Sequence, residues 1–243
     1  MNTKLLKVFT GMAVLLLLVS ACGYIPTRGS GDLITETRDV SGFDAVEFSG
    51  AGDVEIIQDG TESITIETDD DVMEHVTTEV HGGTLYVGFD FDGPVSIMPT
   101  EMNVTLHVSA LDEISASGAW DVTAESLETG RLDASISGAG SIHIDSLTAD
   151  DLIVDVSGAG EVEIGGEVVS ARISLSGAGK YQAGDLQSAT TSIDISGAGE
   201  ATVWATESLD VEVSGAGQVD YYGSPTVSFD QSGAGDVHSL GDK

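Results

Sequence analysis

The sequence predicts an all-β chain that folds as a parallel β-solenoid with coils of about 18–20 residues. The motif Ser-Gly-Ala-Gly occurs seven times, and Ser-Gly-Ala-Trp at residues 117–120 is a near-copy of it. From Ser117 onward, successive motifs begin 20, 20, 19, 20, 18 and 18 residues apart. Apolar and polar residues alternate on both sides of each motif, which is typical of short strands. A fixed period near 20 residues indicates stacked coils, because one coil cannot bury its own apolar face.

The first segment, residues 1–21, is predicted to be a lipoprotein signal peptide. Lys4 and Lys7 precede an apolar run at residues 8–19, which is too short to span a bilayer and typical of a signal peptide. The run ends in Leu-Val-Ser-Ala before Cys22, which resembles a bacterial lipobox. We therefore expect Cys22 to be acylated and to become the mature N-terminus. The alternative is an ordinary cleavable signal that happens to end near a cysteine.

The rest of the chain is divided by its composition and its repeats. Residues 22–37 contain the lipidated cysteine, one proline and three glycines, and show no periodicity, so we expect a flexible tether. Residues 38–243 are long enough for one domain with a substantial core. Within it we expect irregular N-terminal coils or a cap at 38–110 and repeat coils at 111–238. The 68-residue gap between the first two corner motifs has room for about three degenerate coils or for a cap.

The irregular part nevertheless contains local signals. Alternation predicts strands at 63–67, 84–89 and 102–108, and the stretch 72–80 is compatible with a helical turn.

Each repeat predicts two strands that meet at a glycine corner. In the stretch 134–144, Ile136, Ile142 and Ile144 share the inward parity while His143 points outward. Glycine allows positive φ and close backbone approach, and recurrence in register makes the motif structural rather than a phosphate-binding loop. The corner residues are Ser49, Gly50, Gly52, Gly138, Gly140, Gly158, Gly160, Gly177, Gly179, Gly197, Gly199, Gly215, Gly217, Gly233 and Gly235.

A third stretch lies between successive corners and contains one apolar residue per coil. These residues are Leu127, Leu147, Val168 and Leu186. They predict a third short strand or a turn. The shortening of the coil from 20 to 18 residues is expected in this stretch, because the connections at 205–208 and 223–225 are trimmed.

The charge of the chain limits its partners. It contains 41 acidic and 8 basic residues, a net charge of −33. Such a surface repels nucleic acid and anionic headgroups, so we expect no nucleic-acid partner and membrane attachment only through the N-terminal lipid. A glycan or protein of the envelope or of another surface is the expected ligand. Solubility is the simplest role of the acidity. Calcium binding stays open, although the nonapeptide of calcium β-rolls is absent.

The sequence contains no pattern that predicts catalysis. The five histidines, at 75, 81, 107, 143 and 238, have no zinc-type spacing, and no serine has a nucleophile-elbow context. We therefore predict no catalytic residue, metal ligand or cofactor, and no enzymatic activity.

Two aromatic residues are the candidates for surface contact. Trp120 replaces the second glycine of its corner, and Trp204 has the outward parity. Exposed aromatic rings can stack on sugar rings. Trp120 is equally compatible with a plug at the end of a coil.

Several blocks of the sequence resemble the bacterial putative auto-transporter adhesin family, head GIN domain. The blocks are residues 39–56, 84–89 and 104–124, followed by the repeats, and the resemblance extends over about residues 38–237. It implies a single-stranded right-handed parallel β-helix and transfers no catalytic residue. Ser109 stands where the family pattern usually has proline.

These observations lead to one functional expectation with two alternatives. We expect a lipid-anchored, non-catalytic binding or adhesion module of the cell envelope. Gly23, rather than aspartate, follows Cys22, which favours the outer membrane or cell surface if the organism has an outer membrane. The alternatives are a periplasm-facing structural scaffold and a glycan-active β-helix enzyme.

Overall fold

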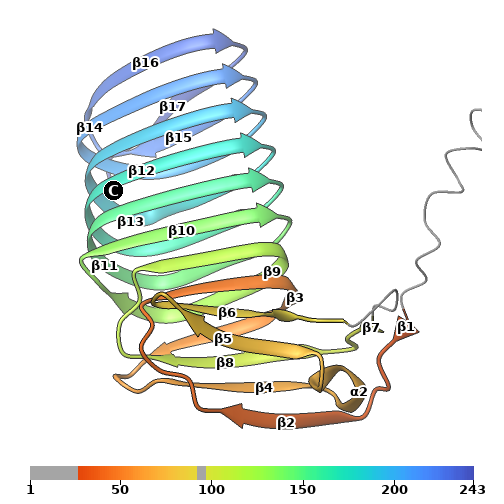
Figure 1. Cartoon of the computed structure of the whole chain (residues 1–243). Helices are drawn as coiled ribbons and strands as arrows, with labels where there is room; N and C mark the ends of the chain where they lie inside the picture. The colour runs from red at the N-terminus through yellow and green to blue at the C-terminus, as the bar shows by residue number, and fades with distance from the viewer. Residues whose placement is uncertain (1–26, 92–96) are drawn as a thin grey trace, which may run out of the picture.

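The computed structural model describes residues 27–91 and 97–243. Its coils stack into one column, a parallel β-solenoid, with a cap of shorter elements at the base (Figure 1). The predicted single-stranded parallel β-helix is therefore confirmed. The signal peptide and Cys22 lie outside the described residues, so their predictions are not tested here. None of the helices in the described part of the chain is long and apolar enough to cross a membrane.

The strands of the column pair with their counterparts one coil away. They are β3 (Ala45–Gln58), β9 (Glu113–Glu128), β10 (Arg131–Gly138), β11 (Ser141–Gly158), β12 (Glu161–Gly177), β13 (Lys180–Gly197), β14 (Glu200–Gly215), β15 (Gln218–Tyr222), β16 (Thr226–Gly233) and β17 (Asp236–Gly241). All neighbours in this series are parallel, and Ser137 lies opposite both Ser117 and Ser157. The corner motifs consequently stack in register.

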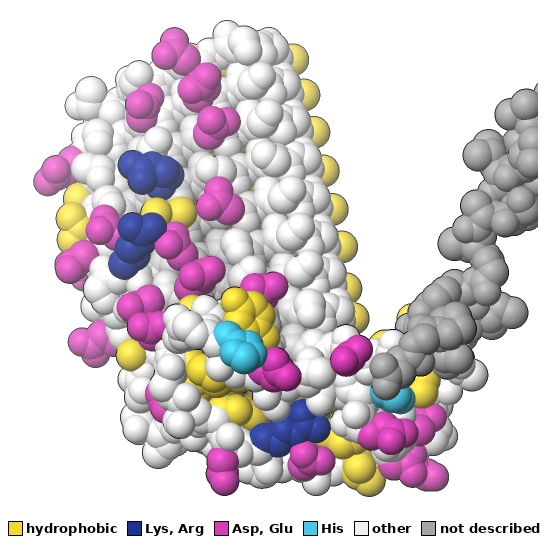
Figure 2. Space-filling view, in the orientation of Figure 1, with side chains coloured by type: hydrophobic (Ala, Val, Ile, Leu, Met, Phe, Trp, Pro, Cys, Tyr) yellow, Lys and Arg dark blue, Asp and Glu magenta, His cyan; other side chains and the backbone are white. Residues whose placement is uncertain are grey.

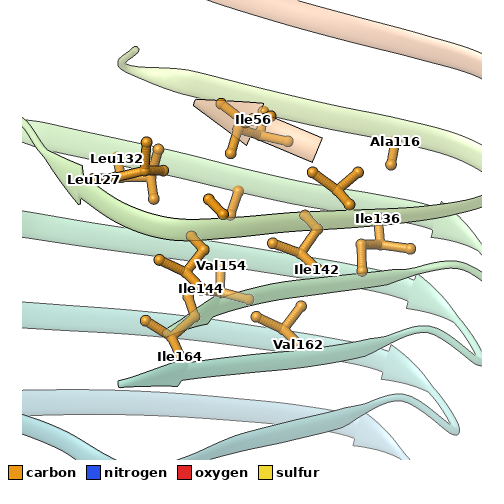
Figure 3. Close-up of a cluster of buried hydrophobic side chains, with 14 of the residues drawn as sticks. Ile56, Ala116, Leu127, Leu132, Ile136, Ile142, Ile144, Val154, Val162 and Ile164 are labelled. Atoms are coloured by element: carbon orange, nitrogen blue, oxygen red, sulfur yellow. The ribbon is translucent and has the colours of Figure 1, made fainter. Parts of the chain in front are cut away.

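The core runs along the axis of the column. Figure 3 shows inward side chains such as Ile136, Ile142 and Val154 filling the space that the coils enclose, and these three are at most 1% exposed. The apolar residues of the third stretch lie within β9, β11, β12 and β13 and are also buried. Apolar burial of this kind is the main favourable contribution to folding.

The two glycines of a corner meet different requirements. Gly158 has φ +120°, and a Cβ there would lie 2.4 Å from the carbonyl oxygen of Gly138 in the coil below. Gly160 has no such φ, but its Cβ would lie 2.6 Å from Cγ2 of Ile136. The N–H of Ala159 donates to the Gly138 carbonyl at 2.8 Å, which links successive corners. The corner therefore needs positive φ at its first glycine and space at its second.

The alanine of each corner points outward. These alanines are exposed in every coil, and Figure 2 shows an evenly spaced column of hydrophobic side chains along the edge where the strands of Figure 1 end. Acidic side chains are scattered over the same view, with few basic ones among them.

The base of the column contains one interrupted coil and an antiparallel cap. Ser49 lies directly opposite Ser117, so the 68-residue gap inserts no coil between β3 and β9. Strands β6 (Thr84–Phe89) and β8 (Met102–Val108) lie parallel to β3 on its other side. Antiparallel pairing of β4 (Ser63–Asp69) with β8, and of β5 (Val76–His81) with β6, ends the stack. The gap thus contains one interrupted coil together with a cap.

The helical turn expected at 72–80 is largely wrong. The helix α2 covers only Asp70–Met73, and the chain then enters β5. Val76 is buried, and β5 pairs with β6 along its length. Sheet pairing therefore overrides the local helical pattern, as tertiary contacts often do.

The flexible tether is also wrong for the part of 22–37 that the structure describes. Strand β1 (Thr27–Arg28) pairs with β7 (Ile97–Met98), and β2 (Leu33–Arg38) pairs antiparallel with β4. These residues are ordered because the buried carboxylate of Asp69 requires hydrogen-bond donors, which this segment helps to provide. It accepts hydrogen bonds from the N–H of Gly31 at 2.7 Å and the N–H of Thr100 at 2.6 Å.

Candidate functional site

A groove of about 300 Å³ opens on the outer face of the sheet formed by the second strand of each coil. Its wall nearer the base comes from His143, Asp145 and Glu163, and its other wall includes Tyr222. His143 and Glu163 are opposite each other in the register of β11 and β12. Because strand side chains alternate, outward positions of successive coils collect on one face of the solenoid.

A change in coil length produces the hollow. Between β13 and β14, Ala183 pairs with Val203, whereas the next pair is Gln187 with Trp204. The three residues 184–186 therefore have no counterpart in the shorter coil, and Asp185 projects outward with an 87% exposed side chain. A Cβ at Gly184 would lie 3.3 Å from Cε2 of Tyr222, so glycine leaves room for that ring.

The base-side wall is a histidine between two carboxylates. Nε2 of His143 lies 2.8 Å from Oδ1 of Asp145, and its Nδ1 lies 3.2 Å from Oε2 of Glu163. The hydrogen bond to Asp145 raises the pKa of His143 above its ordinary value of 6.5, partial burial opposes this, and the charge of Glu163 adds to the rise. The imidazolium form of His143 is thus favoured. Each carboxylate uses one oxygen for this contact, and its other oxygen can still accept hydrogen bonds.

The opposite wall contains Tyr222, with Trp204 beside it, and both rings lie near an ammonium group. Nζ of Lys243 lies 5.5 Å from the ring centroid of Trp204 and 5.1 Å from that of Tyr222. The same nitrogen donates to the carbonyl oxygen of Gly184 at 2.5 Å and forms an ion pair with Asp185. Both distances to the rings fall within the range of cation–π interactions.

A larger hollow of about 820 Å³ lies over Gln58, Thr129 and neighbouring hydroxyl-bearing residues. Gln58 uses both ends of its amide there, since it donates to the Glu128 carbonyl at 3.0 Å and accepts from the Glu128 N–H at 2.7 Å. The polar group at its rim is thus already paired within the protein. The groove at Trp204 is the stronger candidate because it combines aromatic faces with unshared carboxylate oxygens.

The structure places the two predicted aromatic contacts differently. Trp204 is partly exposed, beside the groove, next to Tyr222 in the strand register. Trp120 is 0% exposed, so its expected exposure is wrong. The second corner position faces the core, where Trp120 packs against Phe48 with ring centroids 5.3 Å apart and occupies the space that a Cβ on Gly52 would need.

Among the other predicted site residues, Cys22 lies outside the described residues, and the corner residues contact one another between coils. The corner serines and glycines stack at one edge of the column, away from the groove residues. Within residues 27–91 and 97–243, no three histidine, cysteine or acidic side chains gather in a way that could hold a metal ion. Sequence reasoning did not identify Tyr222, Asp185 or Lys243 as site residues. The only signal for them was the shortening of the coil.

The chain resembles several solved structures. A putative adhesin from Bacteroides fragilis is 30% identical, with a TM-score of 0.81, and the match covers 88% of this chain and 99% of that one. A putative lipid binding protein from Parabacteroides distasonis is 23% identical (TM-score 0.74, 89% and 100% covered), and a putative adhesin from Parabacteroides merdae is 23% identical (TM-score 0.69, 88% and 98% covered). The last two likenesses show the fold alone.

A search among curated proteins finds no match. The family model of the putative auto-transporter adhesin, head GIN domain, matches residues 42–225, which include the first corner, the cap without β1 and β2, and all but the last coil. The chain therefore belongs to the putative auto-transporter adhesin family, head GIN domain.

Proposed function

We propose that the protein is a lipid-anchored, non-catalytic adhesion module of the cell envelope, which binds its ligand in the groove beside Trp204. The observation that supports this most is the groove itself, because its walls come from successive coils of a rigid stack. A scaffold that fixes aromatic and polar side chains in advance binds with a smaller entropic loss. The 30% identity to the putative adhesin from Bacteroides fragilis supports the same function.

The pairing of ionisable groups in the groove supports binding rather than catalysis. His143 is held between Asp145 and Glu163, and Lys243 is paired with Asp185. A general acid or base needs an atom that can reach the substrate, whereas both ring nitrogens of His143 and the ammonium group of Lys243 already contact carboxylates. The remaining acceptor edges and the two rings suit recognition of a polar ligand.

The proposed anchor would hold the base of the solenoid near a membrane. Strand β1 begins at Thr27, and the five residues from Cys22 span at most about 18 Å when fully extended. The coils that form the groove lie two to six coils above the first corner, roughly 10 to 30 Å along the stack at the usual strand spacing. The groove would then lie on the side of the column, at that distance above the base and the lipid.

Replacing the acylated cysteine tests the anchor. We expect Cys22→Ser to move the full-length protein from the membrane fraction to the soluble fraction, while Ser20→Ala, a change beside the lipobox cysteine, leaves it membrane-bound. Persistence of the Cys22→Ser protein in washed membranes would contradict lipid anchoring.

Two cell experiments test adhesion. Protease added to intact cells should digest the solenoid, and a deletion strain should lose retention on the surface to which the parent strain adheres. Protection of the domain in intact cells, with digestion after lysis, would instead support the periplasm-facing scaffold. Unchanged retention of the deletion strain would rule out the adhesive function.

A further inference from the structure

The ammonium group of Lys243 sits in a built cage rather than in an ordinary surface ion pair. Four groups surround it: the rings of Trp204 and Tyr222, the Asp185 carboxylate and the Gly184 carbonyl oxygen. They come from three successive coils, β13, β14 and β15. Ring faces, a carbonyl and a carboxylate together satisfy an organic ammonium ion from several sides.

A second lysine on the same sheet provides the contrast. Lys180 contacts Glu200 at 3.2 Å in the neighbouring coil, and its side chain is 50% exposed. No aromatic ring lies over it in the described structure. The Lys180 pair is thus an ordinary ion pair between neighbouring strands on an exposed face. Lys243, in contrast, occupies the hollow that the shortened coil creates.

We propose that this cage is a binding site for the ammonium group of an amino sugar, and that Lys243 fills it as an intramolecular stand-in. This proposal rests on the adhesive function proposed above and specifies its ligand. The cage consists of the groups around Lys243 Nζ. A ligand amine takes the place of Nζ and makes the same contacts.

The rest of the groove favours a sugar as the carrier of the amine. Its volume of about 300 Å³ is at the lower end of small-molecule sites. Gln182 and Thr202 line it beside the cage and offer hydrogen-bond donors and acceptors to ring hydroxyls. Aromatic faces next to such groups are the usual surface for a pyranose ring. The acidic wall at Asp145 and Glu163 complements the positive charge of a further amino sugar residue.

The test uses two ligands that differ only in N-acetylation of their amino groups. The full chain, purified in detergent, is titrated with a glucosamine tetramer and with the matched N-acetylglucosamine tetramer, by calorimetry and by tryptophan fluorescence. Trp120 is fully buried, so a fluorescence change reports Trp204. We expect the amine form to bind and the acetylated form to bind at least about tenfold more weakly, since it lacks the ammonium group.

Variants locate the binding to the cage. Lys243→Ala should increase affinity about tenfold, because the internal competitor is removed. Asp185→Asn and Trp204→Leu should each reduce it about tenfold in that background, with unchanged circular dichroism as the folding control. Lys180→Ala is the matched control, since it removes one lysine outside the cage and should change the affinity less than twofold.

Each of three results would overturn the proposal. They are no binding of the glucosamine tetramer to Lys243→Ala, equal binding of the acetylated tetramer, and binding of Nα-acetyl-lysine amide in preference to the tetramer, which would indicate a protein lysine as the ligand. Loss of retention in the deletion strain together with no amine binding would refute only this ligand. Amine binding together with unchanged retention would refute only the adhesive function.

Discussion

At the scale of single residues, two buried polar atoms in the described structure lack a hydrogen-bond partner: Nε1 of Trp120 and the hydroxyl of Tyr181. Both residues are among the largest fully buried side chains. Burial alone raises the pKa of the Tyr181 phenol far above its ordinary value of 10. An unpaired buried hydroxyl lowers the stability of the fold by about 1–3 kcal/mol. The two rings therefore contribute to stability through the core volume that they fill and not through their polar atoms.

Removing the Tyr181 hydroxyl should stabilise the solenoid. We expect Tyr181→Phe to raise the free energy of unfolding by about 1 kcal/mol and the melting temperature by about 2–4 °C. Tyr86→Phe is the control, because Tyr86 is 40% exposed and its hydroxyl reaches water. Thermal and urea unfolding of the three proteins measure the difference. A less stable Tyr181→Phe would mean that the hydroxyl has a partner such as a buried water.

Asp69 is the opposite case, a buried carboxylate with a full set of donors. Burial acts to raise its pKa, but hydrogen bonds from Thr100 and Gly31 outweigh it and leave the pKa below the ordinary value of 3.8. A lowered folded pKa contributes stability that is complete above the unfolded value and is lost as the pH falls through the folded value. The cap should therefore loosen below about pH 4.

Substituting Asp69 should release the N-terminal strands from the cap. Asp69→Asn places an amide where only acceptors fit, and we expect a loss of about 2–3 kcal/mol, together with a weaker dependence of stability on acid. Asp71→Asn is the control, since Asp71 accepts one hydrogen bond, from the Ser30 N–H at 3.0 Å. Urea unfolding at pH 7 and pH 4, and proteolysis near residue 30, measure both effects. Equal behaviour of the two variants would refute this role.

At the scale of elements, the corner decides how closely coils can stack. The positive φ of Gly158 and its approach to the Gly138 carbonyl both exclude a side chain. The third stretch accommodates shifts of register, such as the one between β13 and β14, and coils of different length therefore fit one stack. That variation lets Gly184 and Asp185 form one side of the groove.

A methyl group at the corner should be far more costly than one at an open turn. We expect Gly158→Ala to lower the free energy of unfolding by at least about 3 kcal/mol through strain and overpacking. Gly130→Ala is the matched control, because nothing lies within 4 Å of a Cβ there and its φ is not positive. We expect that change to be neutral or stabilising by up to about 1 kcal/mol. Similar losses for both variants, measured in urea, would contradict the stacking argument.

At the scale of the whole molecule, the two ends of the column differ. The base is covered by antiparallel strands, whereas the coil of β16 and β17 has a neighbour on one side only among the described residues. Val227 and Phe229 are each 38% exposed, while Leu209 and Val211, their partners one coil below, are 1% and 0% exposed. The stability of a solenoid is approximately the sum of the stabilities of its coils and of the interfaces between neighbouring coils. The end coil has one such interface instead of two and is therefore held less strongly.

Hydrogen exchange should follow that gradient. We expect amides of β16 and β17 to exchange fastest and those of β11 to β13 slowest, with the capped base protected more than the open end. Exchange measured by mass spectrometry at several protein concentrations checks this. Protection of β16 equal to that of β12 would contradict an open end, and concentration-dependent protection would show that a second copy covers it.

Repetition explains how much of the fold could be predicted. The corner motif, the strand parity and the coil length are local properties that recur every 18–20 residues. The same pattern in each coil therefore supports the prediction made for the others. The cap has no internal copy, and its antiparallel pairs depend on contacts such as Asp69 with Gly31, which are 38 residues apart. Local patterns do not contain such pairings, and for that reason the tether and the helical turn were predicted wrongly.

The sequence by itself determined the solenoid, its register and the family, because alternation and glycine spacing act within one coil and repeat in the next. Only the tertiary structure decided which outward positions form a site. Trp204 has the expected parity, but its partners Asp185 and Lys243 lie 58 residues apart and meet through the stacking of several coils. Trp120 is buried because its corner position faces the core. Spacing along the chain specifies which way a side chain points, whereas its neighbours depend on how the coils pack.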